Sequence, residues 1–275
     1  MHRQKRIALV NDLTGFGRCS IAVELPLISA LKVQACPLPT AILSVHTGFP
    51  SHYLDDYTGR MRQYIDNWQE NGLEFDGIST GFLGSAEQIG IVLDFIHRFK
   101  KDHTMVMIDP VMGDYGKLYS SYTEEMCHEM RKLLSEADLV TPNLTEACEL
   151  LGIPYPDGGV ISDVALDAMA ADLSKQGPSQ VVITGLSNGD HIRNYVYERG
   201  KKARVLTVDK IGGDRSGTGD AFAAIVSACM VKDIPLYDAV KKATDFISKA
   251  LEYTEGLGLP WNYGLAFEEY LCDLR

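Results

Sequence analysis

The most informative stretch of the chain is Met105-Val106-Met107-Ile108-Asp109-Pro110-Val111-Met112-Gly113-Asp114-Tyr115-Gly116. Its first four residues are apolar without alternation, which indicates a strand buried on both faces of a sheet. Similar runs occupy residues 7–10, 77–80 and 181–183, and residues 89–99 repeat apolar side chains at helical spacing. Strands that alternate with helices predict an α/β protein whose mostly parallel sheet is covered by helices on both faces.

The rest of the chain extends this pattern. We expect extended segments at residues 33–38, 41–45 and 139–140, and helices over residues 19–31, 54–68, 124–134 and most of 219–253. Residues 194–208 alternate in polarity around the turn Arg199-Gly200-Lys201, which predicts a hairpin at an antiparallel edge of the sheet. Because no linker or repeat divides the sequence, we expect a single domain over residues 1–275.

Composition and charge exclude several classes of protein. The 275 residues are 45% hydrophobic and 23% charged, which is typical of a globular chain and excludes collagen-like and disordered ones. With 26 Lys and Arg against 37 Asp and Glu, the net charge of −11 argues against a nucleic-acid partner. No run approaches the ~20 apolar residues of a membrane span. Six scattered cysteines without a C-x-x-C pair predict no zinc site and favour the cytoplasm.

The same net charge repels anions, so a phosphate ligand would need a local attractive feature. The loop Gly213-Asp214-Arg215-Ser216-Gly217-Thr218-Gly219-Asp220 offers one, because its glycines let backbone N–H groups turn inward where an apolar helix begins. Free amides at the positive end of a helix dipole bind anions. Asp220 could either cap this helix or act as a base beside the anion. The loop lacks the lysine of a P-loop and lies too late in the chain for a dinucleotide fingerprint.

Two further loops follow buried strands, where ligands gather in open α/β sheets. Asp109 and Asp114 follow the strand at residues 105–108 and either hold a cation or form an ordinary polar turn. Asn143 and Glu146, after the strand at 139–140, have the spacing of a helix capping box, which explains both residues locally. The alternative is that Glu146 orients Mg²⁺ on a nucleotide phosphate, directly or through water.

The loops at residues 11–18 and 44–48 also offer polar groups, of a kind suited to a small polar ring. The first begins with Asn11 and Asp12, and the second contains His46, Thr47 and Gly48. A single histidine in a protein is more often structural than catalytic, so His46 indicates little by itself.

Taken together, these loops resemble the ribokinase-like superfamily, and more closely its pyridoxal kinase branch. Gly217-Thr218-Gly219-Asp220-Ala221-Phe222 is similar to the C-terminal signature of the superfamily, and Asp109-Pro110-Val111-Met112-Gly113-Asp114 to the D-P-V-x-G-D segment of pyridoxal kinases. Thr141-Pro142-Asn143 with Glu146 matches T-P-N-x-x-E, Val181-Val182-Ile183-Thr184 matches the strand whose threonine approaches the nucleotide, and His46-Thr47 matches the H-T beside the pyridoxal ring. The motifs occur in the family's order from about residue 7 to residue 255, and they imply a three-layer α/β/α sandwich.

The resemblance implies ATP-dependent phosphorylation of the 5′-hydroxymethyl group of pyridoxal, pyridoxamine or pyridoxine. Asp220 would accept the hydroxyl proton, while the amides of Gly217, Thr218 and Gly219 would hold the charge on the transferring group. An ordinary carboxylate pKa already leaves an aspartate ionised at neutral pH. We therefore expect Asp220 to need placement more than tuning.

The resemblance also implies the remaining contacts. The nucleotide would be bound by Asp114, Asn143, Glu146, Thr184, Thr218 and Gly219. Mg²⁺ would be held by Glu146 and Asp114, and a K⁺ or Na⁺ by Asp109, Thr141 and Thr184. The acceptor ring would contact Asn11, His46, Thr47 and Phe82, beside Asp220.

Two positions depart from the family pattern. Asn11-Asp12 stands where many pyridoxal kinases have Ser-His, so the ring contact falls to Asn11, or to Asp12 if the register slips by one. Phe82 stands where the family often has tyrosine, which keeps the stacking surface and loses the hydroxyl. Both changes leave the preferred form of the vitamin open.

Several other functions remain as alternatives. The nearest is a hydroxymethylpyrimidine kinase, or an enzyme acting on both rings, although Asp114 and the loop at residues 113–119 favour the pyridoxal branch. A sugar kinase is disfavoured because the chain lacks the residues for a β-lid, and an NAD-dependent oxidoreductase because no G-x-G-x-x-G follows the first strand. A nucleotide-sensing protein on the same fold would not need Asp220 and Glu146. The resemblance implies a homodimer.

Overall fold

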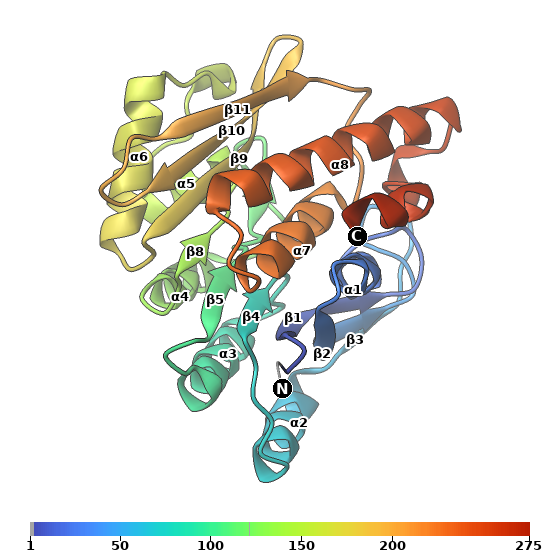
Figure 1. Ribbon diagram of the computed structural model, residues 1–275, viewed down its shortest axis with the longest axis vertical. Coiled ribbons are helices and arrows are strands. Elements are labelled where there is room, and N and C mark those ends of the chain that lie inside the picture. The colour runs from blue at the N-terminus through green and yellow to red at the C-terminus, as the bar shows by residue number, and fades with distance from the viewer. Residues whose placement is uncertain (1–2, 121) are drawn as a thin grey trace.

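The computed structural model describes residues 3–120 and 122–275 and shows a nine-stranded sheet between two layers of helices (Figure 1). The strands lie in the order β11-β10-β9-β8-β5-β4-β1-β2-β3. Their bounds are β1 (Arg6–Thr14), β2 (Gln34–Leu43), β3 (Leu54–Asp56), β4 (Gly77–Thr80), β5 (Met105–Ile108), β8 (Leu139–Val140), β9 (Gln180–Asn188), β10 (His191–Glu198) and β11 (Arg204–Asp209). A small separate hairpin pairs β6 (Gly113–Asp114) with β7 (Lys117–Leu118).

The central strands of the sheet run parallel and both of its edges are antiparallel. Parallel pairing joins β2, β1, β4, β5, β8 and β9 in that order. At one edge β10 pairs antiparallel with both β9 and β11, which confirms the hairpin predicted around residues 199–201. At the other edge β3 pairs antiparallel with β2. All six central strands therefore end on the same side of the molecule.

Helices cover both faces of the sheet (Figure 1). One layer contains α1 (Ile21–Ala30), α7 (Thr218–Met230) and α8 (Leu236–Gly256), and the other contains α2 (Thr58–Glu70), α3 (Ala86–Phe99), α4 (Glu124–Leu134), α5 (Leu144–Leu151) and α6 (Asp163–Lys175). Alternate residues of β1 divide between the two cores, with Ile7 and Leu9 facing the α1–α7 layer and Ala8 and Val10 facing the other. This confirms the predicted three-layer α/β/α sandwich.

The predicted elements differ from the observed ones at the β2–β3 edge. The two extended segments expected at 33–38 and 41–45 are one strand, β2, because residues 34–43 pair continuously along β1 apart from a single register shift. The helix expected over 54–68 begins only at Thr58, since Leu54–Asp56 form the edge strand β3. Side chains at these three positions cannot reveal a strand that exists only through pairing with β2. None of the helices in the described residues is both long and apolar enough to cross a bilayer.

Candidate active site

A row of residues crosses β1 and the ends of the neighbouring parallel strands β4, β5 and β8. Val10, Thr80, Ile108 and Val140 are paired in register, so the next residue of each strand, Asn11, Gly81, Asp109 and Thr141, occupies the same level. Asn11 lies on the same face of β1 as Ile7 and Leu9, toward α1 and α7. A Cβ atom at Gly81 would lie 2.3 Å from Nδ2 of Asn11, so only glycine leaves room for this side chain.

The glycine-rich loop places the start of α7 above this row. Gly217 is the N-cap of α7, has a left-handed φ of 82° and makes no side-chain cap. The first amides of the helix are therefore left for a ligand, as an anion site requires. A Cβ at Gly217 would lie 2.1 Å from the carbonyl oxygen of Arg18, which shows how closely the loop after β1 approaches.

Asp220 lies in the first turn of α7 and points toward Asn11. Its Oδ1 atom is 3.4 Å from Nδ2 of Asn11. The alternative in which Asp220 caps the helix is wrong, because Gly217 occupies the N-cap position and Asp220 lies three residues farther on. The carboxylate is therefore free of a capping role and lies beside the helix amides, where a base for a bound hydroxyl would be needed.

The pKa of Asp220 differs from the ordinary value that its type suggests. Burial raises it to about 6, the backbone of Ser20 opposes that shift, and the charge of Asp12 adds to it. Asp220 is thus tuned as well as placed. A base with a pKa near the working pH balances ionisation against affinity for the proton, which suits general-base catalysis.

Other carboxyl groups gather around the same end of the sheet. Burial, followed by the charges of Glu146 and Asp220, raises the pKa of Asp109 well above its usual range. Burial raises the pKa of Glu146 to about 7. Glu24, which was not predicted as a site residue, is 2% exposed on α1, and burial followed by the charge of Asp220 also raises its pKa well above its usual range. Because neighbouring carboxylates repel each other, carboxyl groups this close together bind protons or cations more readily than isolated ones.

The donor set around Asp109 fits a cation with oxygen ligands. Thr141 lies next to Asp109 in the row, is 4% exposed, and its Oγ1 atom has no hydrogen-bond partner. A buried hydroxyl without a partner beside a half-buried carboxyl is suited to a bound ion. Across residues 3–120 and 122–275, however, no three His, Cys, Asp or Glu side chains are arranged to hold a metal by themselves. A cation here would need backbone oxygens, water or ligand phosphates as well.

Asn143 and Glu146 form the predicted capping box at the start of α5. Asn143 Oδ1 accepts from the Glu146 amide at 3.0 Å, and Glu146 Oε2 accepts from the Asn143 amide at 2.8 Å. Glu146 Oε1 also accepts from the Met112 amide at 3.1 Å, and Asn143 Nδ2 donates to the Gly113 carbonyl at 2.8 Å. The pair therefore fastens the loop after β5 to α5. The predicted role of Glu146 in orienting Mg²⁺ stays a prediction.

Asp114 and Thr184 lie farther out on the same edge. Asp114 is exposed on the β6–β7 hairpin, and its charge contributes to the raised pKa of Glu146. The hydroxyl of Tyr115, next along the hairpin, donates to both oxygens of Asp214 at 2.8 Å, so the hairpin contacts the glycine-rich loop. The Thr184 amide donates to the Pro142 carbonyl at 2.9 Å, which places Thr184 beside the TPN segment.

The residues predicted to contact a ring divide into two groups. Asn11 and Asp12 are buried and engaged inside the protein, since Asp12 accepts from Thr14 at 2.7 Å and from Ser20 at 2.5 Å. The ring contact predicted for Asn11, or for Asp12, stays a prediction. Phe82 is half-buried, and its amide donates to Asn11 Oδ1 at 2.8 Å. Asn11 is thus placed to act on Asp220 and on the β4 loop.

His46 belongs to an aromatic cluster that the sequence did not predict. Its Nε2 atom is 2.8 Å from the Asn262 carbonyl oxygen, and its Nδ1 accepts from the Gly48 amide at 3.1 Å. Around it lie Phe16, Phe49, Trp261 and Tyr263, with ring centroids 4.9–6.4 Å apart along the chain of contacts. Phe16 is 48% and Trp261 is 54% exposed. Thr47 is also exposed, so this aromatic surface is open to a flat ligand.

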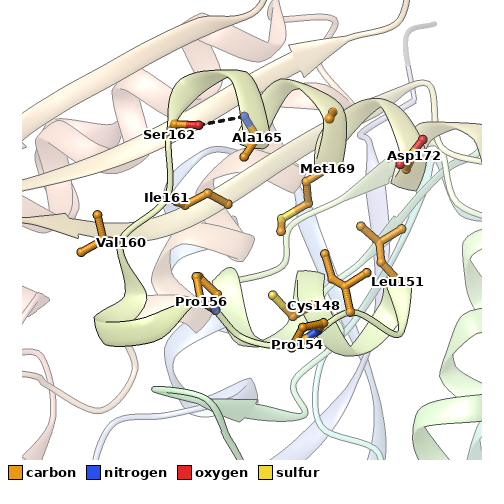
Figure 2. A pocket seen from close by; sticks show the side chains of 12 residues that line it. Cys148, Leu151, Pro154, Pro156, Val160, Ile161, Ser162, Ala165, Met169 and Asp172 are labelled. Atoms are coloured by element: carbon orange, nitrogen blue, oxygen red, sulfur yellow. Dashed lines mark hydrogen bonds between the residues drawn. The ribbon is translucent and has the colours of Figure 1, made fainter.

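A pocket of about 430 Å³ lies elsewhere, between α5, the segment at residues 152–162 and α6 (Figure 2). Its lining is mostly apolar and includes Cys148, Leu151, Ile161 and Met169. It contains none of the predicted site residues. The chemistry at the carboxyl ends of the strands therefore does not extend into this pocket.

The raised pKa values predict how stability depends on pH. Glu146 has a pKa of about 7 in the folded protein against an ordinary 4.5, so the folded state holds an extra proton between these values. Without cations, the free energy of unfolding should therefore fall as pH rises from 4.5 to 7, by about 3 kcal/mol for Glu146 over the whole interval. About 1.4 kcal/mol of this, or roughly 3–5 °C in Tm, is lost between pH 6 and pH 8. Thermal unfolding in chelator-treated buffer at pH 6 and pH 8 measures this.

Mg²⁺ and K⁺ should restore Tm more at pH 8 than at pH 6, because they compete with protons for the same carboxyl groups. Tetramethylammonium chloride at equal ionic strength is the control, since it screens charge without entering the site. A Tm that is the same at both pH values in cation-free buffer would contradict the prediction.

Similarity to solved structures assigns the architecture to the ribokinase-like kinases. Pyridoxal kinase from Lactobacillus plantarum superposes with a TM-score of 0.91 at 25% identity, covering 99% of this chain and 97% of that one. A Bacteroides thetaiotaomicron protein assigned as a phosphomethylpyrimidine kinase and crystallised with pyridoxal has a TM-score of 0.95 at 37% identity, over 99% and 96% of the two chains.

The chain belongs to the phosphomethylpyrimidine kinase family, whose model matches residues 21–263. Hydroxymethylpyrimidine/phosphomethylpyrimidine kinase of Haemophilus influenzae is 30% identical over 194 residues, 69% of this chain and 70% of that protein. Pyridoxal kinase of Arabidopsis thaliana is 31% identical over 209 residues, 72% of this chain and 65% of that protein, just under two thirds of its length. The chain is thus a kinase of the group that contains both activities, as the resemblance predicted.

Proposed function

We propose that this kinase transfers the γ-phosphoryl group of ATP to the 5′-hydroxymethyl group of pyridoxal, pyridoxamine or pyridoxine. The observation that carries the proposal is Asp220, a carboxylate with a pKa of about 6 beside the uncapped amides of α7. Asp220 accepts the hydroxyl proton as the oxygen attacks the γ-phosphorus. The amides of Gly217, Thr218 and Gly219 hold the charge that develops on the transferring group.

The nucleotide and cations are assigned to the side of Asp220 that lies away from the acceptor ring. Asp114 in β6, Asn143 and Glu146 at the start of α5, and Thr184 in β9 are proposed to contact ATP and its Mg²⁺. Asp109 and Thr141, with Thr184, are proposed to hold K⁺ or Na⁺. Bound Mg²⁺ would neutralise phosphate charge, and the protein's own acids would keep it in place.

The acceptor ring is assigned to the aromatic surface around His46, with Thr47 and Phe82. The exposed faces of Phe16 and Trp261 there suit a flat pyridine ring. The 37%-identical Bacteroides protein was crystallised with pyridoxal, which supports the pyridine as the acceptor. The proposal includes a single kinase domain over residues 1–275, a homodimer, and a cytoplasmic location as the cysteine pattern predicts.

The second candidate is hydroxymethylpyrimidine, alone or in addition to pyridoxal. Two comparisons favour the pyrimidine. The matching family is named for phosphomethylpyrimidine kinase, and the Haemophilus relative is a hydroxymethylpyrimidine/phosphomethylpyrimidine kinase. The two rings share a flat shape and a hydroxymethyl group. The discrimination between them therefore depends on the ring substituents and not on Asp220.

An acceptor panel tests the proposal. Purified protein with Mg-ATP and K⁺ is offered pyridoxal, pyridoxamine, pyridoxine and hydroxymethylpyrimidine separately, and each phosphorylated product is measured by mass spectrometry. We expect kcat/KM to be highest for one of the three pyridines. If only hydroxymethylpyrimidine is phosphorylated, the proposal is wrong and the protein is a hydroxymethylpyrimidine kinase. ATP turnover without any phosphorylated acceptor would indicate a nucleotide sensor.

A further inference from the structure

Glu24 is a buried carboxyl that the proposed reaction does not use. It is the one charged residue in Ile21–Ala30, a helix whose other side chains are mostly apolar, and it is 2% exposed. Among the described residues no Lys, Arg or His forms an ion pair with it, and its one side-chain hydrogen bond comes from Nδ2 of Asn11 at 3.2 Å. A carboxyl is expensive to bury. Its presence there calls for an explanation beyond packing.

The side-chain amide of Asn11 connects Glu24 to Asp220. Asn11 Oδ1 accepts from two backbone amides, those of Asp12 at 2.9 Å and Phe82 at 2.8 Å. This fixes which end of the amide is oxygen, so Nδ2 must face the other way. Its two N–H groups then point to Glu24 Oε2 at 3.2 Å and to Asp220 Oδ1 at 3.4 Å.

We propose that Glu24 is a positioning residue that fixes the carboxylate of Asp220 through the side-chain amide of Asn11. The proposal rests on the proposed function, in which Asp220 is the base. With Glu24 accepting one N–H of Asn11, the amide is held at three points and its remaining N–H is directed at Asp220. Without that acceptor, one buried N–H of Asn11 loses its partner and the amide can turn away from Asp220.

The charges of the two carboxyls are consistent with this role. Burial and then the charge of Asp220 raise the pKa of Glu24 well above its usual range, whereas the pKa of Asp220 is about 6. Either protonation state of Glu24 leaves a side-chain oxygen that accepts from Asn11, so this hydrogen bond does not depend on the charge of Glu24.

Two substitutions at one position test the proposal. Glu24→Gln keeps a side-chain oxygen that can accept from Asn11, and Glu24→Leu removes it at similar volume. Removing a carboxyl that is costly to bury offsets the cost of the Asn11 N–H that loses its acceptor, so the leucine variant should fold. We expect Glu24→Leu to lower kcat by about tenfold, because small misplacements of a reacting group are costly. KM for ATP and for the acceptor should change less than about twofold, and Glu24→Gln should keep at least about half of wild-type kcat.

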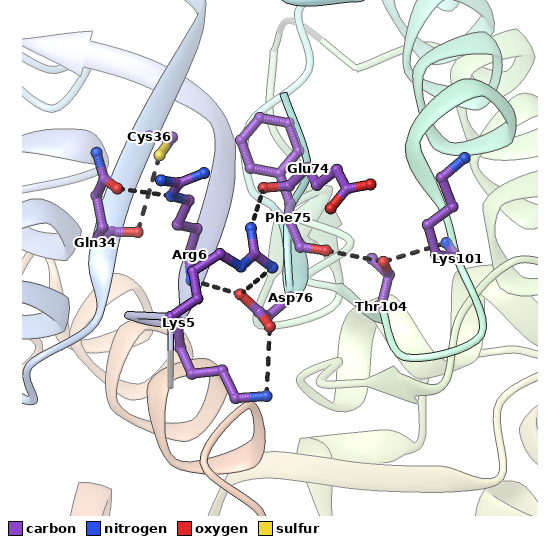
Figure 3. Close-up of polar contacts among 10 residues, drawn as sticks. Lys5, Arg6, Gln34, Cys36, Glu74, Phe75, Asp76, Lys101 and Thr104 are labelled. Atoms are coloured by element: carbon purple, nitrogen blue, oxygen red, sulfur yellow. Dashed lines mark hydrogen bonds and ion pairs between the residues drawn. The ribbon is translucent and has the colours of Figure 1, made fainter. Parts of the chain in front are cut away.

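Asp76→Asn is the matched control. Asp76 is also a buried carboxyl, 6% exposed, but it lies at the amino ends of β1 and β4, where it accepts from Arg3 and from the Arg6 amide and pairs with Lys5 (Figure 3). We expect this variant to lower Tm and leave kcat unchanged. A general loss of stability is thereby separated from a loss of positioning.

Wild-type kcat in Glu24→Leu would overturn the proposal, and so would a Glu24→Gln variant as slow as Glu24→Leu, since charge and not the hydrogen bond would then matter. A crystal structure of Glu24→Leu gives a reading that does not depend on activity: Asp220 should be displaced or split between conformers, and an unmoved Asp220 overturns the proposal. If the wild-type protein phosphorylates no acceptor, the proposed function fails while this structural comparison still decides the role of Glu24.

Discussion

Asp220→Asn is expected to lower kcat by ~10²-fold or more while leaving the affinity for ATP nearly unchanged. Asparagine preserves the shape of the side chain at the start of α7 and cannot accept the hydroxyl proton. In the wild-type protein kcat should fall as pH drops through about 6, where Asp220 becomes protonated. The variant should lose this acid limb. Steady-state kinetics from pH 5 to pH 8 and calorimetric titration with ATP measure both effects.

The matched control for this variant is Asp238→Asn. Asp238 is the acidic residue in the first turn of α8, so the substitution removes the same charge from the same position of a neighbouring helix. Its kcat should stay close to wild type. Near-wild-type turnover in Asp220→Asn would remove Asp220 from the role of base and with it the proposed mechanism.

Gly217→Ala is expected to lower both stability and activity strongly. The φ of 82° at Gly217 costs an alanine on the order of 1–3 kcal/mol, and its Cβ would lie 2.1 Å from the Arg18 carbonyl oxygen. The nearest atoms, O and C of Arg18, belong to the backbone and not to a flexible side chain, so either α7 or the loop after β1 must move. Because a shift of about 1 Å in a reacting group can cost 10²-fold, we expect kcat to fall by about that factor. Thermal unfolding and steady-state kinetics measure the two losses.

Gly213→Ala, four residues earlier in the same loop, is the control for this prediction. Its Cβ would meet nothing within 4 Å, and its φ is not in the left-handed region. We expect Tm and kcat near wild type. A Gly217→Ala variant that behaves like Gly213→Ala would show that the helix start tolerates displacement, which would contradict an anion site built from fixed amides.

Most of the layered fold could be predicted because its strands are apolar on both faces. Gly77–Thr80 is buried throughout and Met105–Ile108 at all but its first residue, and both were predicted with their observed bounds. The edge strand β3 could not be predicted, since Leu54–Asp56 alternates weakly and exists by pairing with β2. The alternation of residues 194–208 did predict the opposite edge, whereas β3 depends on a partner that its local sequence does not show.

The candidate site could be predicted in part, because several of its residues stand in loops that follow the predicted strands. Asp220, Asp109 and Glu146 stand in loops with recognisable motifs, and the structure brings all three to one end of the sheet. The raised pKa of Asp220 could not be predicted, because it depends on burial by residues far along the chain. The four hydrogen bonds that Asn11 makes within the protein could not be predicted either, because their partners are spread from residue 12 to residue 220.

The sequence gives weaker indications of Glu24 and Trp261 than of the residues in the motifs. Glu24 is a lone charge in an otherwise apolar helical segment, and that contrast could have marked it as buried and engaged. Trp261 lies near the end of the chain, outside every motif, and reaches His46 only because the segment at 260–264 folds back over the loop after β2. No local pattern encodes such a return.

The contact between Asn11 and Asp220 joins residues 209 positions apart, from the first strand and the seventh helix. During synthesis, the loops after β1 and β2 emerge long before the residue that would act on their ligand. A chain that ends before Asp220 therefore holds only part of the proposed ring surface, without Trp261, and has no means of transferring a phosphoryl group. Closing so long a loop is also slow. Activity should consequently return last during refolding, after secondary structure and after burial of the core around α3 and α4.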